Sequence, residues 1–148
     1  MTDTTPSRPP RIDIREQNKG VIEQYRASAG KPADGAMPLV LLTTTGTRSG
    51  KEHTTPVCVR EDGDTLVVAG TKGGMPRHPQ WYVNLVANPA LTVEYLGDTY
   101  RAHATTVENS PDRDRLFEMM SAVIPGIYGY QDRCRDTRQI PVVRLTRI

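Results

Sequence analysis

Hydrophobic positions along this chain follow a helical spacing near the N-terminus and change to short strand-like runs further on. Val21 and Tyr25 lie one helical turn apart, which predicts a helix over about 13–28. Gly30 follows as a stop signal. The segment before the helix, 1–11, is polar and contains three prolines, so it is expected to form a disordered tail.

Six short runs of apolar and β-branched residues, each bounded by turn residues, predict strands. They lie at 39–45, 53–60, 65–70, 91–96, 99–108 and 140–145. Glu61-Asp62-Gly63-Asp64 and Gly97-Asp98 are typical of hairpin turns, which favours an antiparallel sheet. Closure into a small barrel would remove the exposed edges of such short strands. The predicted fold class is α+β, mainly β: a six-stranded, largely antiparallel barrel with flanking helices, in one domain over 12–148.

Two more helices are predicted between the strands. Pro79 stands where a helix would begin, and the apolar positions after it continue at helical spacing until Asn88-Pro89. Ser110-Pro111 is an N-cap followed by a first helical residue, and starts a helix that Pro125-Gly126 ends. The stretch 126–137, which contains tyrosine and glycine, is expected to be a loop.

Composition excludes several classes of protein. The 148 residues carry 19 basic and 17 acidic side chains, without the basic excess of a nucleic-acid coat. Two cysteines, Cys58 and Cys134, cannot form a disulfide scaffold and indicate free thiols in a reducing cytoplasm. The three histidines lie far apart, so no metal site is expected. No apolar run approaches the length of about eighteen residues that a membrane span needs, which leaves at most peripheral membrane contact.

Two short basic turns are candidates for binding an anion. Gly46-Thr47-Arg48-Ser49-Gly50-Lys51 resembles a phosphate loop, but its spacing and the following Glu52 do not fit a nucleoside-triphosphate site. Thr71-Lys72-Gly73-Gly74 offers a charge and backbone that a ligand can approach closely. A plain polar turn and a flexible loop are the alternatives, and the sequence leaves open whether the two turns lie near each other.

Two aromatic segments are the remaining candidates. Asn84 lies on the same helical face as Trp81, as a polar group beside an aromatic wall, although a lone tryptophan usually belongs to the core. Tyr128-Gly129-Tyr130 resembles a mobile lid with a proton-donating hydroxyl, the alternative being tyrosines that pack the barrel end. Arginines and aspartates alternate in the same C-terminal region and are expected on a solvated face; these arginines are Arg113, Arg115, Arg133, Arg135 and Arg138.

In this order the segments resemble the deazaflavin-dependent nitroreductase family of split-β-barrel flavin and deazaflavin oxidoreductases. The resemblance covers about 37–145, and the part from Thr43 to Pro89 is the most specific. It is carried by Leu41-Leu42-Thr43-Thr44-Thr45-Gly46-Thr47-Arg48-Ser49-Gly50, Pro56, Lys72-Gly73-Gly74, Pro79-x-Trp81-Tyr82-x-Asn84-Leu85-x-x-Asn88-Pro89 and Ile140-Pro141-Val142-Val143.

The resemblance implies a split β-barrel that binds coenzyme F420, a deazaflavin with a phosphate and a polyglutamate tail. It also implies an enzyme that transfers a hydride from the reduced coenzyme to a small hydrophobic acceptor: a quinone, an enone or a nitro compound. Tyr130 and Tyr128, or water, are the candidates for supplying the proton. The coenzyme-binding residues that it implies are Arg48, Ser49, Gly50, Thr54, Thr55, Pro56, Val57, Cys58, Val59, Gly70, Thr71, Lys72, Gly73, Gln80, Trp81, Tyr82, Val83 and Asn84.

Two other functions remain as alternatives: an FMN-binding oxidoreductase of the pyridoxamine-oxidase-like kind, and a non-catalytic protein that binds and sequesters F420. Thr47 stands where relatives often have a second basic residue, and Cys58 where they often have an aromatic one. Acceptor preference is therefore not inherited with the resemblance. Monomer and homodimer both stay open, and the expected location is the cytoplasm, at most peripheral to the inner face of the cell membrane.

Overall fold

The structure, a computed structural model, describes residues 14–148; the expected tail 1–11 lies outside this range. The described helices are α1 (Ile14–Ala27), α2 (Gln80–Ala87), α3 (Pro111–Ser121) and α4 (Ile127–Cys134), with a short 3-10 helix, η1, at Lys72–Gly74. The described strands are β1 (Leu39–Thr45), β2 (Glu52–Cys58), β3 (Arg60–Asp62), β4 (Thr65–Ala69), β5 (Ala90–Tyr95), β6 (Asp98–Thr106) and β7 (Val142–Arg147).

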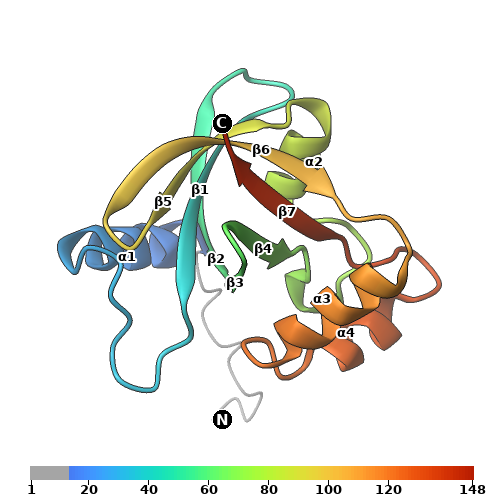
Figure 1. Ribbon diagram of the computed structural model, residues 1–148. Coiled ribbons are helices and arrows are strands. Elements are labelled where there is room, and N and C mark those ends of the chain that lie inside the picture. Colours follow the sequence, from blue (N-terminus) through green and yellow to red (C-terminus); the bar gives the residue numbers. More distant parts are fainter. Residues whose placement is uncertain (1–13) are drawn as a thin grey trace, which may run out of the picture.

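All the strands belong to one antiparallel sheet, in the order β2-β1-β5-β6-β7-β4-β3. The two edge strands, β2 and β3, are separated in the sequence by Val59 alone. The chain therefore leaves one edge of the sheet and joins the other edge one residue later, which requires the sheet to curl on itself (Figure 1). This arrangement confirms the predicted mainly β, antiparallel split barrel with flanking helices.

The strand count differs from the prediction at one point. The expected strand 53–60 is two strands, because Val59 turns inward: its side chain is buried and its N–H donates to the carbonyl of Pro38 at 3.2 Å. On one side of Val59 the chain pairs with β1, and on the other side it pairs with β4. A single residue thus transfers the chain between edges, which a period-two pattern does not reveal.

Apolar residues of the sheet form two clusters, one on each face of β4. Leu66 and Val68 belong to the cluster within the curled sheet, together with Trp81 and Leu85 of α2. Val67 and Ala69 point to the opposite face, where the apolar sides of α3 and α4 cover them. This two-sided burial explains why four consecutive residues of β4, from Leu66 to Ala69, are apolar. Figure 1 shows α3 and α4 side by side at the lower right, away from the C-terminus at the top of the picture.

The predicted loop over 126–137 is wrong, because residues 127–134 form α4. Ile127 and Cys134 are seven residues apart, lie on one helical face and are both buried in the cluster against α3. The exposed Gly129 is tolerated within this short helix. By contrast, the cap predicted for α3 is confirmed, since the Ser110 hydroxyl accepts from the N–H of Arg113 at 3.1 Å.

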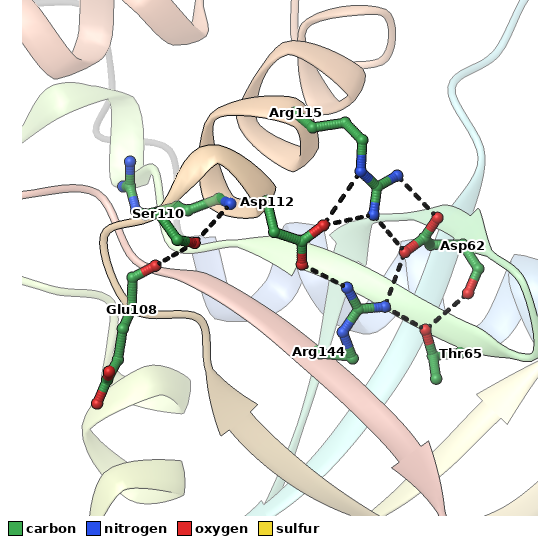
Figure 2. Close-up of polar contacts among 8 residues, drawn as sticks. Asp62, Thr65, Glu108, Ser110, Asp112, Arg115 and Arg144 are labelled. Carbon is green, nitrogen blue, oxygen red and sulfur yellow. Dashed lines mark hydrogen bonds and ion pairs between the residues drawn. The ribbon is translucent and has the colours of Figure 1, made fainter.

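A network of charged side chains fastens the β3–β4 turn to α3 and β7 (Figure 2). Asp62 accepts from Arg115 at 3.0 Å and from Arg144 at 2.8 Å, and Asp112 bridges the same two arginines. These guanidinium groups hold the pKa of Asp62 well below its usual range, the hydrogen bond from Arg115 having the largest effect.

The C-terminal arginines were expected on a solvated face. This prediction is wrong for Arg113 and Arg138, both of which are buried.

Candidate functional site

The β1–β2 turn, residues 46–51, is held by its own backbone. The N–H of Gly46 donates to the carbonyl of Lys51 at 2.8 Å, and the hydroxyl of Ser49 accepts from the N–H of Lys51 at 3.1 Å. Gly50 has a φ of 68°, a left-handed conformation that glycine adopts without strain. Arg48, Ser49 and Gly50 are all exposed on this tight turn, so the Arg48 guanidinium reaches solvent.

The segment between β4 and α2 is packed more closely. Gly70 is buried, and a Cβ at this position would lie 2.8 Å from the ring of Pro141. Thr71 leads into η1, where Lys72 and Gly73 are exposed and Gly74 is buried. The exposed Lys72 therefore lies between two buried glycines, Gly70 and Gly74, which fix the ends of this segment.

A cavity of about 470 Å³ opens between this segment and the start of α2. Three of the predicted site residues line it: Lys72, Gln80 and Val83. The other lining residues are Pro76, Arg77, His78, Thr137 and Arg138. Within the described range 14–148 the lining is strongly basic and contains no acidic side chain, which suits an anionic ligand.

Helix α2 connects this cavity to the end of β1. Its Asn84 is 1% exposed and donates to the hydroxyl of Thr44 at 3.0 Å, while Gln80 donates to the amide oxygen of Asn84 at 2.9 Å. The turn with Arg48 begins two residues after Thr44, and Gln80 lines the cavity with Lys72. The hydrogen-bonded side chains of Gln80, Asn84 and Thr44 thus link the cavity, which Lys72 lines, to the end of β1, where the turn 46–51 begins. No residue of 46–51 lines the cavity itself.

Other predicted residues of α2 have structural contacts. Trp81 is buried in the core cluster, as the core interpretation predicted. Tyr82 is half-buried, and its hydroxyl pairs with that of Thr106 at 3.0 Å. Its ring meets the imidazole of His78 edge-on, with 4.9 Å between ring centroids. Tyr82 thus packs against a residue that lines the cavity, without lining it itself.

The predicted residues of β2, Thr54 to Cys58, are half-buried and pair on one side only, with β1. The Thr54 and Thr43 hydroxyls lie 2.8 Å apart across that pair. Half of the backbone groups of β2 therefore have no strand partner within the described chain, and Pro56 fits such an edge. Burial raises the pKa of the Cys58 thiol, which favours its neutral form.

The two predicted tyrosines have different surroundings. Tyr128 is exposed; its hydroxyl donates to the carboxylate of Glu118, and its ring meets Phe117 edge-on. Tyr130 is half-buried and packs with Cys58, Met119 and Ile124 against the cluster under α3 and α4. Neither tyrosine lines the cavity.

Two residues at the cavity were missed as site residues, His78 and Arg138. Arg138 is 9% exposed and binds four acceptors in the segment between β4 and α2, one of them the imidazole of His78. Burial, and then the charge of Arg138, lower the pKa of His78. Only spatial proximity reveals this pair, because 60 residues separate the two in the chain.

No group of three potential metal ligands among His, Cys, Asp and Glu occurs in residues 14–148. Over the same range, no helix has the length and apolar character needed to cross a membrane.

Comparison with known proteins gives a consistent result. The family model of the F420H(2)-dependent quinone reductases matches residues 14–147. The F420H(2)-dependent quinone reductase Rv1261c of Mycobacterium tuberculosis is 37% identical over 128 residues, which are 83% of this chain and 85% of that protein.

Solved structures agree with the sequence comparison. A solved F420-H2-dependent reductase, FDR-A, is 32% identical with a TM-score of 0.65, over 73% of this chain and 93% of that one. A protein solved as a domain-swapped dimer is 30% identical with a TM-score of 0.66, over 89% of this chain and 96% of that one. The chain belongs to the F420H(2)-dependent quinone reductase family.

Proposed function

We propose that this protein is an enzyme that uses reduced coenzyme F420 to reduce quinones by two electrons. The observation that carries the proposal is the basic cavity at the start of α2, in a chain of this family. Lys72, Arg77 and Arg138 supply its charge. When bound, the reduced coenzyme supplies the hydride, so the protein has to orient two ligands rather than provide a nucleophile.

The residues present fit this coenzyme. Its phosphate and polyglutamate tail are anionic, and the described lining of the cavity is basic without an opposing carboxylate. Arg48 offers a further, exposed cation outside the cavity, on the turn after β1, in agreement with a long ligand that has more than one anionic group. The free edge of β2 offers backbone donors and acceptors for a flat, polar ring system.

Four segments are proposed to hold the coenzyme. The β1–β2 turn and η1 bind its anionic part, β2 runs beside it, and α2 flanks the ring system. The proposed residues are Arg48, Ser49, Gly50, Thr54, Thr55, Pro56, Val57, Cys58, Val59, Gly70, Thr71, Lys72, Gly73, Gln80, Trp81, Tyr82, Val83 and Asn84. Trp81, Val59 and Asn84 are buried, so their part is to support the exposed members of the set.

Tyr130 is the first candidate for supplying the proton to the reduced acceptor, and Tyr128 is the second. The Tyr130 ring lies over Gly126, and the residue packs against the same apolar cluster as Met119 and Ile124. Such an apolar, half-buried surface suits a hydrophobic quinone, and enones or nitro compounds are further acceptors of the same character. Tyr128 already donates to Glu118, which occupies its hydroxyl hydrogen.

We place the protein in the cytoplasm, with contact to the inner face of the membrane at most peripheral. Hydrophobic quinones partition into membranes, which makes such contact useful to the enzyme. For the assembly we propose a monomer or a homodimer, and analytical ultracentrifugation distinguishes the two.

Fluorescence titration with F420 and with FMN tests the choice of coenzyme. We expect saturable binding of F420 and much weaker binding of FMN. Tight binding of FMN without affinity for F420 would instead support the pyridoxamine-oxidase-like alternative and overturn the proposal.

A further inference from the structure

Arg138 organises the cavity wall through contacts with one segment of the chain. Its guanidinium donates to the carbonyl oxygens of Gly70 at 2.8 Å, Thr71 at 2.7 Å and Met75 at 2.9 Å. The same Nη1 lies 3.2 Å from Nδ1 of His78. One buried side chain thus holds both the segment that carries Lys72 and the imidazole beside it.

The contact with His78 fixes the position of the imidazole proton. A guanidinium has donors only, so Nδ1 must accept and the proton of the neutral ring must reside on Nε2. No described residue contacts Nε2 by a hydrogen bond, and residues 14–148 contain no buried side-chain nitrogen or oxygen without a partner. Nε2 is therefore reached by solvent, and the space that His78 lines is the cavity.

The other groups around His78 define what this N–H can bind. Lys72, Arg77 and Arg138 line the same space, and the ring of Tyr82 packs edge-on against the imidazole. These three cations attract an anionic oxygen, and the neutral imidazole adds an N–H donor that forms a directed hydrogen bond to it. The site therefore suits an anionic oxygen.

We propose that Arg138 is a positioning residue that fixes His78 in its Nε2–H form, and that His78 donates this hydrogen bond to an anionic oxygen of the coenzyme. The identity of the ligand rests on the proposed function, whereas the state of the imidazole does not. F420 carries anionic oxygens on its phosphate and on its tail carboxylates, and the proposal places the contact at one of these, away from the reacting ring.

The first test measures the imidazole nitrogens by NMR in the free protein, labelled with ¹⁵N-histidine; the chain has three histidines. We expect His78 to be neutral and protonated on Nε2 at neutral pH. Arg138→Met should give a mixture of tautomers and a higher pKa of His78. Arg135→Met, in the same segment but exposed, is the control. A wild-type His78 protonated on Nδ1, or an unchanged His78 in folded Arg138→Met, would overturn the proposal.

The second test separates the donor of His78 from its packing. His78→Phe keeps a ring beside Tyr82 but removes the donor, and His78→Gln removes the ring but keeps an N–H near the same place. We expect F420 affinity to fall about tenfold in His78→Phe and to stay within about twofold in His78→Gln. The deazariboflavin that lacks the phosphate and the tail should bind equally well to both variants and to the wild type.

Wild-type affinity in His78→Phe would overturn the proposal, and so would an equal loss of affinity for F420 and for the deazariboflavin. Failure of the proposed function has a different signature. In that case the wild type would bind neither F420 nor the deazariboflavin, while the NMR result on the free protein would stand unaffected.

Discussion

Gly74 and Tyr130 are packed backbone to backbone: a Cβ on Gly74 would lie 2.7 Å from the carbonyl oxygen of Tyr130 and 3.0 Å from its Cα. This contact joins η1, which carries Lys72, to α4, which carries the proposed proton donor. Gly126 contributes from the other side, because a Cβ there would lie 3.2 Å from Cζ of Tyr130. Two glycines therefore set the position of this tyrosine.

Replacement of the two neighbouring glycines should have unequal costs. Gly73 and Gly74 both have positive φ, but a Cβ at Gly73 would meet nothing within 4 Å. Gly73→Ala should lower the free energy of unfolding by about 1–2 kcal/mol, the cost of a left-handed alanine. Gly74→Ala adds the collision with Tyr130 and should cost about 2–5 kcal/mol. Urea denaturation measures both values, and equal losses would contradict the packing described for α4.

Removal of the proposed anion-binding cations should weaken coenzyme binding. Lys72→Ala and Arg48→Ala should each cost about 1–3 kcal/mol of F420 binding, as charge-assisted contacts do. Since Arg48 does not line the cavity that contains Lys72, the two losses should add in the double variant. Lys19→Ala, exposed on α1, is the control for net charge in fluorescence titrations. Unchanged affinity in both variants would remove the anion-site assignment.

The two tyrosines should differ in steady-state kinetics. Tyr130→Phe should lower kcat about 10²-fold, in the range for loss of a general acid, and leave the dissociation constant of F420 nearly unchanged. Tyr128→Phe should have little effect on kcat, because its hydroxyl is bound to Glu118. A loss of coenzyme affinity with normal kcat in Tyr130→Phe would show that this residue binds the coenzyme instead.

Asp62 should make stability depend on acidic pH. Its pKa is lowered in the folded protein by Arg115 and Arg144, so its contribution is complete above the unfolded pKa of about 4 and is lost as the pH falls below it. Asp62→Asn should therefore be less stable than the wild type at pH 7, with a difference that narrows in acid. Asp64→Asn, an exposed carboxylate of the same turn, should show no such trend in thermal unfolding scans. A difference that stays constant with pH would argue against the ion-pair network of Figure 2.

Local patterns in the sequence were sufficient to predict those features of the fold that depend on one residue or one short segment. The Ser110 cap, the burial of Trp81 and the hairpin between β5 and β6 followed from the residues themselves. In that hairpin the turn is Leu96-Gly97, one residue before the expected pair, and both residues have positive φ.

Features that depend on distant contacts could not be predicted in this way. The break at Val59 exists because the sheet closes, and α4 is stable because Ile127 and Cys134 find an apolar cluster on α3. The sequence pattern predicted a solvated Arg138, since the acceptors that bind it lie 60 or more residues away. The basic turns were recognised individually, but the cavity that contains only one of them required the structure.

Quinone reduction is tested most directly by anaerobic oxidation of F420H2 with menadione in the presence of the purified protein, followed by absorbance. We expect multiple turnovers, one quinone reduced for each F420H2 oxidised, with a rate that saturates in both substrates. Binding of F420H2 without any turnover would overturn the proposed reductase activity and indicate a protein that only carries the coenzyme.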